Sequence, residues 1–135
     1  MPLPIISVAQ MRDWEQRTWA AGVAEESVMA NAGQAVAQVI LEITPQGGTV
    51  LLLSGKGNNG GDTRIAAEHL PGRSQVVIDA KNPVSGLREF NRALDQLPDL
   101  VVDGLFGIGL DRDLDEDHCE LVRAINQTQL PVLAV

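Results

Sequence analysis

The chain has 135 residues, of which 44% are hydrophobic and 21% are charged, proportions typical of a single soluble globular domain. Eighteen acidic residues against ten basic ones give a formal net charge of −8, which disfavours generic binding to nucleic acid or to an anionic membrane. The single cysteine, Cys119, excludes an internal disulfide and a thiolate metal cluster. The sequence carries no signal-peptide pattern and no apolar stretch of membrane length, so we expect a cytoplasmic protein.

Two helices are expected at the front of the chain, within residues 7–43. Ser7 and Gln10 have capping-box spacing, and Gly22 is a plausible stop for the first helix. The second helix, over 26–42, has apolar residues three and four positions apart, which form one wide stripe. These stripes predict packing faces and favour a homodimer contact.

From residue 49 onward the pattern alternates between strands and helices. Strands are expected over 49–53, 75–78, 100–102 and 131–135, with helices over 62–70, from a cap at Ser85 through Leu97, and over 116–126. This alternation predicts right-handed βαβ units on a mainly parallel sheet, in the α/β class. Because the chain stops inside an apolar strand, which would leave an open edge, we expect residues 1–135 to be one domain truncated at its C-terminal end.

A glycine-rich loop over 54–62 follows the first predicted strand. Glycines let the backbone turn tightly and bring its N–H groups close to an anion, and the next helix points its positive end at the same place. Gly55, Gly57 and Gly60 fit the G-x-G-x-x-G spacing, and Asp79 lies where a ribose-binding carboxylate belongs. On this pattern alone, an NAD(P)-dependent oxidoreductase is indicated.

The polar side chains of the same loop argue against that interpretation. Asn58, Asn59 and Asp62 stand where the dinucleotide fingerprint usually has small, close-packing residues. A third interpretation is that the glycines only form a tight turn between strand and helix. Lys56 either pairs with a substrate phosphate or is simply solvated.

A second glycine-containing loop, over 103–110, follows the third predicted strand. Asp103 lies at the strand end, a common place for a functional carboxylate, although it could equally serve as a turn or cap residue. Together with Asn59, it could form an oxygen-rich site for a hard cation. Gly107 and Gly109 would allow close approach of a phosphate or a sugar.

The two loops, read as ordered motifs, resemble those of the NAD(P)H-hydrate epimerase family. The matching segments are 57–62 after an apolar strand and 102–110, while 31–33 and 130–135 also resemble the family, so the likeness covers nearly the whole chain. The resemblance implies a Rossmann-like three-layer α/β/α domain. It also implies an isomerase that interconverts the R and S forms of hydrated NADH and NADPH in metabolite repair. In many bacteria this domain is fused to an ADP- or ATP-dependent dehydratase, a lyase.

The resemblance also implies a substrate site and a potassium site. The implied substrate-binding residues are Asn58, Asn59, Gly60, Gly61, Asp62, Gly107, Ile108, Gly109, Leu110, Asp111, Arg112 and Asp113. Asn59 and Asp103 are the implied potassium ligands. Inversion of a hydroxyl-bearing carbon also needs proton transfer, for which Asp62 and Asp103 are our candidate catalytic residues. The chain departs from the family pattern at Thr63, where glycine is usual, and at Ala30, where many members have glutamate.

A non-catalytic interaction scaffold is the remaining alternative, and the presence of Asn59, Asp62 and Asp103 argues against it. Both histidines have structural interpretations. His69 complements a helix C-terminus, and His118 precedes Cys119, a small apolar filler, so the two side chains point in different directions. The acidic residues over 111–117 favour a helix N-terminus over a calcium loop.

Overall fold

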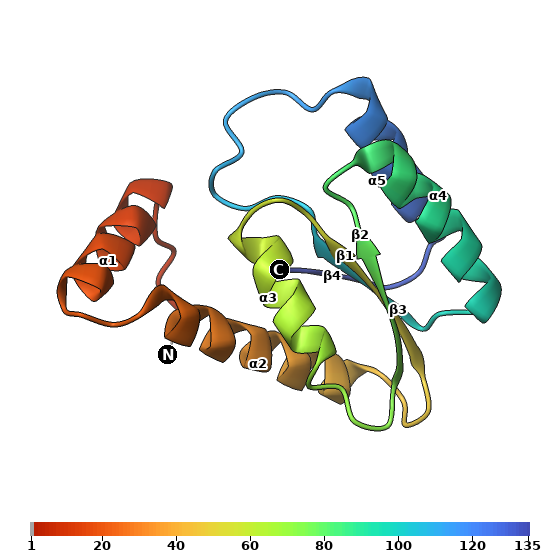
Figure 1. The fold of residues 1–135 in the computed structure, drawn as a ribbon, viewed down its shortest axis with the longest axis horizontal. Helices are drawn as coiled ribbons and strands as arrows, with labels where there is room; N and C mark the ends of the chain where they lie inside the picture. Colours follow the sequence, from red (N-terminus) through yellow and green to blue (C-terminus); the bar gives the residue numbers. More distant parts are fainter. Residues whose placement is uncertain (1) are drawn as a thin grey trace.

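Four parallel strands form the centre of the molecule (Figure 1). The structure, a computed structural model that describes residues 2–135, orders them β2-β1-β3-β4. The strands are β1 (Thr49–Ser54), β2 (Ser74–Asp79), β3 (Leu100–Gly104) and β4 (Val132–Ala134), and all three pairings are parallel. The predicted parallel sheet is therefore confirmed. Its two central strands, β1 and β3, are almost wholly buried, as their continuous apolar runs predict.

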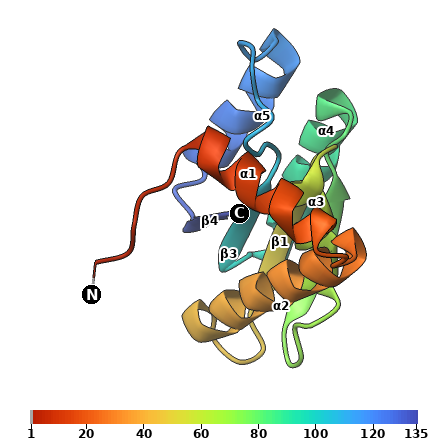
Figure 2. The ribbon, with the colours of Figure 1, turned by 90° about the vertical axis from the view of Figure 1, so that its left-hand side faces the viewer.

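Helices cover both faces of the sheet and complete the predicted three layers (Figures 1 and 2). On one face, α2 (Glu25–Ile43) and α3 (Asn58–Ala67) pack over Leu52 and Val102. On the other, α4 (Pro83–Ala93) and α5 (Glu116–Gln127) pack over Leu51 and Val101. Neighbouring residues of a strand point to opposite faces, so each central strand supplies both cores.

The first helix, α1 (Val8–Ala20), stands apart from these layers (Figure 1). Its predicted capping box is confirmed, because the Ser7 Oγ accepts from the Gln10 N–H at 3.2 Å and the Gln10 Oε1 accepts from the Ser7 N–H at 2.7 Å. No α1 residue is buried, and Trp14 is 54% exposed. The apolar stripe of α1 thus faces largely outward in the single chain, and the homodimer stays a prediction.

The start of α4 differs from the expectation that Ser85 caps it. Asn82 is the cap, and its Oδ1 accepts from the N–H groups of Val84 at 3.0 Å and Ser85 at 3.1 Å. Pro83 occupies the first helical turn, where a missing N–H costs nothing. An asparagine followed by proline is the stronger start signal, and it lengthens the helix by one turn. Within residues 2–135, no helix combines the length and apolar character that crossing a membrane requires.

The turn after α4 holds a strained residue that predicts an easy gain in stability. Leu97 follows the short 3-10 helix η1 (Leu94–Gln96), with φ 52° and ψ 61°, and is 84% exposed. A Cβ in this left-handed conformation costs about 1 kcal/mol or more. Glycine relieves this strain but also adds freedom to the unfolded chain, so we expect Leu97→Gly to raise the free energy of unfolding by a net amount of about 0.5 kcal/mol in chemical denaturation. Leu3→Gly, at an exposed leucine without positive φ, is the control, and an equal gain there would contradict the strain.

Candidate active site

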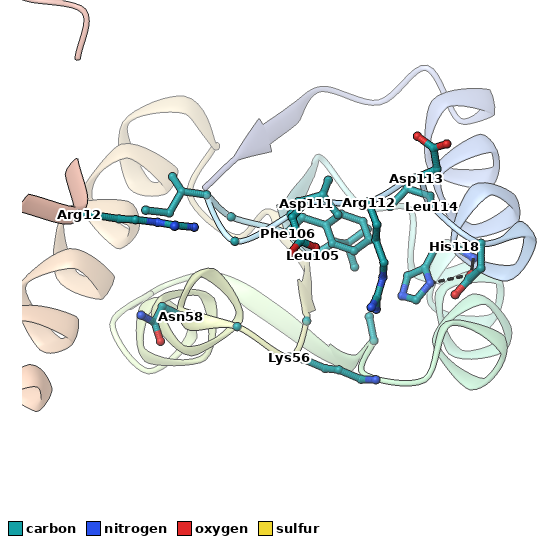
Figure 3. A pocket seen from close by; sticks show the side chains of 18 of the residues that line it. Arg12, Lys56, Asn58, Leu105, Phe106, Asp111, Arg112, Asp113, Leu114 and His118 are labelled. Carbon is teal, nitrogen blue, oxygen red and sulfur yellow. Dashed lines mark hydrogen bonds and ion pairs between the residues drawn. The ribbon is translucent and has the colours of Figure 1, made fainter. Parts of the chain in front are cut away.

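The site lies at the carboxyl ends of β1 and β3, where parallel sheets bind ligands. These strands are neighbours, and the register pairs Leu53 with Asp103 and Ser54 with Gly104, so both motif loops leave the sheet side by side. A cavity of about 550 Å³ opens between the loops and α1 (Figure 3). Its lining comes from α1 (Arg12, Glu15), the β1–α3 loop (55–58), Ala80 after β2, the β3–α5 loop (105–115) and His118 of α5.

The structure brings together only part of the predicted substrate site. Asn58 and all of residues 107–113 line the cavity, whereas residues 59–62 do not. The reason is that α3 begins at Asn58, four residues earlier than expected, after the cap residue Gly57. Asn59 instead contacts Phe106 of the β3–α5 loop, and Gly61 packs against Met29 of α2, so this turn meets the neighbouring loop and α2. Asp79, the possible ribose carboxylate, is also outside the lining and accepts from the Lys81 N–H at 3.0 Å.

Two of the motif glycines allow close backbone packing around the β1–α3 loop. A Cβ on Gly55 would lie under 3.0 Å from the backbone of Leu105, and one on Gly60 equally close to the backbone of Gly55. Gly57 and Gly109, in contrast, have nothing within 4 Å of a Cβ position. Gly57 and Gly109 therefore fit the prediction that glycines let a ligand approach the backbone closely. Gly55 instead packs the β1–α3 loop against the β3–α5 loop, and Gly60 packs the first turn of α3 against Gly55.

Asn59 ties three segments together behind the cavity. Its Nδ2 donates to the carbonyl oxygen of Phe106 at 2.9 Å and also to that of Val135. Its Oδ1 faces Gly107, whose Cβ position would be 3.0 Å away. Asn59 thus joins the first turn of α3 to the β3–α5 loop and to the residue after β4.

Asp103 stabilises the turn after β3. Its Oδ1 accepts from the Leu105 N–H at 3.0 Å, which is the turn role considered from sequence. Within residues 2–135, neither Asp103 Oδ2 nor Asn59 Oδ1 accepts a hydrogen bond, so both oxygens keep free lone pairs. Amide and carboxylate oxygens suit a hard cation. The described chain has no group of three or more His, Cys, Asp or Glu residues that could hold a metal ion. Asp103 Oδ2 and Asn59 Oδ1 therefore fit a hard cation by their chemistry.

Thr63, the departure from the family pattern, is accommodated without strain. Its side chain is fully buried, and its Oγ1 donates to the Asn59 carbonyl at 2.7 Å. The space is available because Gly104 has no side chain, since a Cβ there would collide with the Thr63 Oγ1. The added threonine therefore packs α3 onto β3.

The partial burial of the Asp62 carboxyl lowers the stability of the folded protein at neutral pH, and this effect can be measured. Partial burial on α3, beside α2, raises the pKa of the Asp62 carboxyl above its ordinary value of 3.8. A raised pKa in the folded state means that folding opposes ionisation, so the free energy of unfolding falls as pH rises through and above 3.8. We expect Asp62→Asn to be more stable than the original protein at pH 7 and equally stable near pH 3, measured by urea denaturation. A loss of stability at pH 7 would contradict this.

A histidine–aspartate pair lines the cavity, and the sequence analysis did not assign it to the site. Asp115 caps α5, and its Oδ1 lies 2.9 Å from the His118 N and 2.7 Å from the His118 Nδ1. The backbone and side-chain hydrogen bonds from His118 lower the pKa of Asp115. The ring of Phe106 packs against the imidazole, with centroids 5.3 Å apart. Capping spacing at 115–118 was visible in the sequence, but the contact with Phe106 was not.

The fold is a Rossmann-like α/β domain, because a parallel sheet lies between two helical layers. Its cavity lies at the carboxyl ends of the central strands, where such domains bind ligands. The family of the YjeF-related protein N-terminus matches residues 25–95 and 74–135. The chain belongs to this family.

Similar proteins cover almost the whole chain. An NAD(P)H-hydrate epimerase of Achromobacter xylosoxidans is 38% identical over 98% of this chain and 71% of its own length. The bifunctional NAD(P)H-hydrate repair enzyme Nnr of Gloeobacter violaceus is 35% identical over 97% of this chain, which spans 30% of that protein. The crystal structure of yeast ynu0 (YNL200c) superposes with a TM-score of 0.78 at 20% identity, over 98% of this chain and 70% of the yeast one, and confirms the fold.

Proposed function

We propose that this chain is an isomerase that interconverts the R and S forms of hydrated NADH and NADPH. The observation that carries the proposal is the cavity, because both motif loops that resemble the epimerase family border it. Membership of the YjeF-related family, with relatives named NAD(P)H-hydrate epimerase, supports the same activity. An oxidoreductase is disfavoured because Asp79, its expected ribose carboxylate, lies outside the cavity lining.

The proposed role of the loops is to hold the nucleotide. Gly57 caps α3 without a side-chain hydrogen bond, so first-turn N–H groups remain available to a substrate phosphate. Asn58 and residues 107–113 line the same cavity and would contact the rest of the molecule. This local positive field lets a chain with a net charge of −8 bind an anion. Residues 59–62 act from behind, where they fix the first turn of α3.

A potassium ion is the proposed cofactor. Asn59 Oδ1 and Asp103 Oδ2 would hold it, since their oxygens suit a hard, weakly polarising cation. When bound, the ion supplies positive charge beside the strand ends. Epimer exchange is expected to be faster in potassium salts than in the corresponding tetramethylammonium salts, and Asp103→Asn is expected to reduce that difference. Equal rates in both salts, before and after substitution, would contradict the potassium site.

Proton NMR of the complete protein with an unequal mixture of R- and S-hydrated NADH tests the activity. We expect equilibration far faster than in buffer alone, and slower equilibration in Asp103→Asn, which removes the negative charge of a proposed potassium ligand. Calorimetric titration with hydrated NADH and with NAD⁺ separates the alternatives. Tight binding of NAD⁺ without exchange would favour an oxidoreductase, and failure to bind either nucleotide would favour an interaction scaffold.

Three further features of the protein accompany this proposal: its oligomeric state, its compartment and a fused domain. The exposed apolar residues of α1, including Trp14 and Trp19, support a homodimer, which sedimentation would detect. The single free thiol of Cys119 supports a reducing compartment such as the cytoplasm. Similarity to the bifunctional enzyme supports fusion to a dehydratase in the complete protein.

A further inference from the structure

The epimerisation proposed above needs a proton donor and a proton acceptor in the cavity. The C–O bond at the hydrated ring carbon breaks as the ring nitrogen's electron pair forms a C=N bond, and the hydroxyl leaves as water after taking a proton. Water then adds to the opposite face, the electron pair returns to nitrogen, and the added water releases a proton. One proton enters and one leaves, so no oxidant or reductant is required.

The carboxylates first considered for this task lie outside the cavity lining. Neither Asp62 nor Asp103 lines the cavity. Ordinary carboxylates are ionised at neutral pH and cannot donate a proton, while lysine and arginine remain protonated and cannot accept one. Among the lining side chains, only the imidazole of His118 can do both near neutral pH.

We propose that His118 is the acid–base group of the epimerisation and that Asp115 positions it. This inference rests on the proposed function. Asp115 Oδ1 lies 2.7 Å from the His118 Nδ1, and a carboxylate can only accept, so the proton stays on Nδ1. The neutral imidazole then has its free lone pair on Nε2. In the protonated imidazole, Nε2–H can donate to the leaving hydroxyl, after which Nε2 takes a proton back from the incoming water.

The surroundings of His118 suit this exchange. Its side chain is 19% exposed and packed against Phe106, so the ring is held in one orientation. Figure 3 shows one ring nitrogen of His118 at the dashed hydrogen bond and the other on the side of Arg112. Within residues 2–135, Nε2 has no hydrogen-bond partner.

Several charged groups share the cavity with His118. Arg112 and Asp113 come from the same loop as Asp115, Lys56 comes from the β1–α3 loop, and Arg12 and Glu15 come from α1. The face that α4 packs against α5 is apolar, through Phe90 and Ala93. The charged groups around the imidazole therefore lie on its cavity side, where a substrate would bind.

Epimer exchange measured by NMR across pH tests the assignment. His118→Gln keeps a side-chain donor for Asp115 but does not titrate, and we expect it to lower kcat by about 100-fold or more. Because the protonated ring starts the cycle, kcat/KM of the original protein should fall as rising pH removes the proton from the imidazolium, and this fall should vanish in the variant. Asp115→Asn keeps the helix cap and should move the pH profile while reducing kcat less. His69→Gln, at an exposed histidine outside the cavity, is the matched control and should leave both unchanged.

A second measurement needs no change to His118. The chain has two histidines, so long-range ¹H–¹⁵N spectra of His69→Gln report His118 alone. We expect the neutral ring to carry its proton on Nδ1, and a proton on Nε2 would overturn the proposal. Exchange that persists at the original rate in His118→Gln would overturn it too. Absence of exchange in the unsubstituted protein would instead overturn the proposed function, and this inference with it.

Discussion

Replacing Gly55 by alanine is expected to destabilise the protein by about 3 kcal/mol, near the upper end for a single added methyl group. The new Cβ would lie under 3.0 Å from the backbone atoms of Leu105. Backbone cannot rotate aside as a flexible side chain can. The Gly55 N–H also donates to the Gly104 carbonyl at 3.0 Å, so the loop cannot move away without losing this hydrogen bond. Urea denaturation measures the loss.

Gly109→Ala is the matched control for this prediction. It adds the same methyl group to the other motif loop, at a residue without positive φ and with nothing within 4 Å of the Cβ position. The expected change in the free energy of unfolding is within about 0.5 kcal/mol. Equal losses in the two variants would show that glycine flexibility, and not contact between the loops, sets the stability of this region.

The architecture was predictable because it depends on patterns that lie close together in the sequence. Continuous apolar runs such as 50–53 require burial on both faces, and their alternation with helices leaves few options besides a parallel three-layer fold. The helix starts were less predictable. α3 begins at Asn58, although two of residues 58–61 are glycines, which disfavour a helix. The backbone of Gly55 packs against this first turn and stabilises it.

The cavity lining was predictable only where a motif lies in one loop. Residues 107–113, which the family resemblance implies for the substrate site, line the cavity as one continuous segment. Arg12 reaches the cavity from α1, which has no buried residue and whose position over the loops no local pattern encodes. His118 was interpreted through its neighbour Cys119, but its surroundings are set by Phe106, twelve positions earlier on a different element. Long-range contacts of this kind appear only in the fold.

The second large effect is expected for Asn59→Asp, which replaces the amide NH₂ group by an oxygen and hardly alters the shape of the side chain. The Asn59 amide donates to the carbonyl oxygens of Phe106 and Val135. An aspartate would replace this donor by a charged oxygen facing two acceptors, which loses both hydrogen bonds and adds repulsion. At pH 7 we expect a loss of about 3 kcal/mol in the free energy of unfolding, together with loss of epimer exchange.

The pH dependence of this loss distinguishes repulsion from a change of packing. Repulsion disfavours the ionised carboxylate in the folded state, so the penalty should shrink as pH falls toward about 4 and the introduced carboxyl takes up a proton, which it can then donate. Asn58→Asp is the control, since it adds the same charge one residue earlier, at an exposed side chain without a hydrogen bond in the described chain. There the charge lies at the positive end of α3, and stability should change by about 0.5 kcal/mol or less. A loss at residue 59 that is the same at pH 4 and pH 7 would contradict the proposed repulsion, because only an ionisable contact responds to pH.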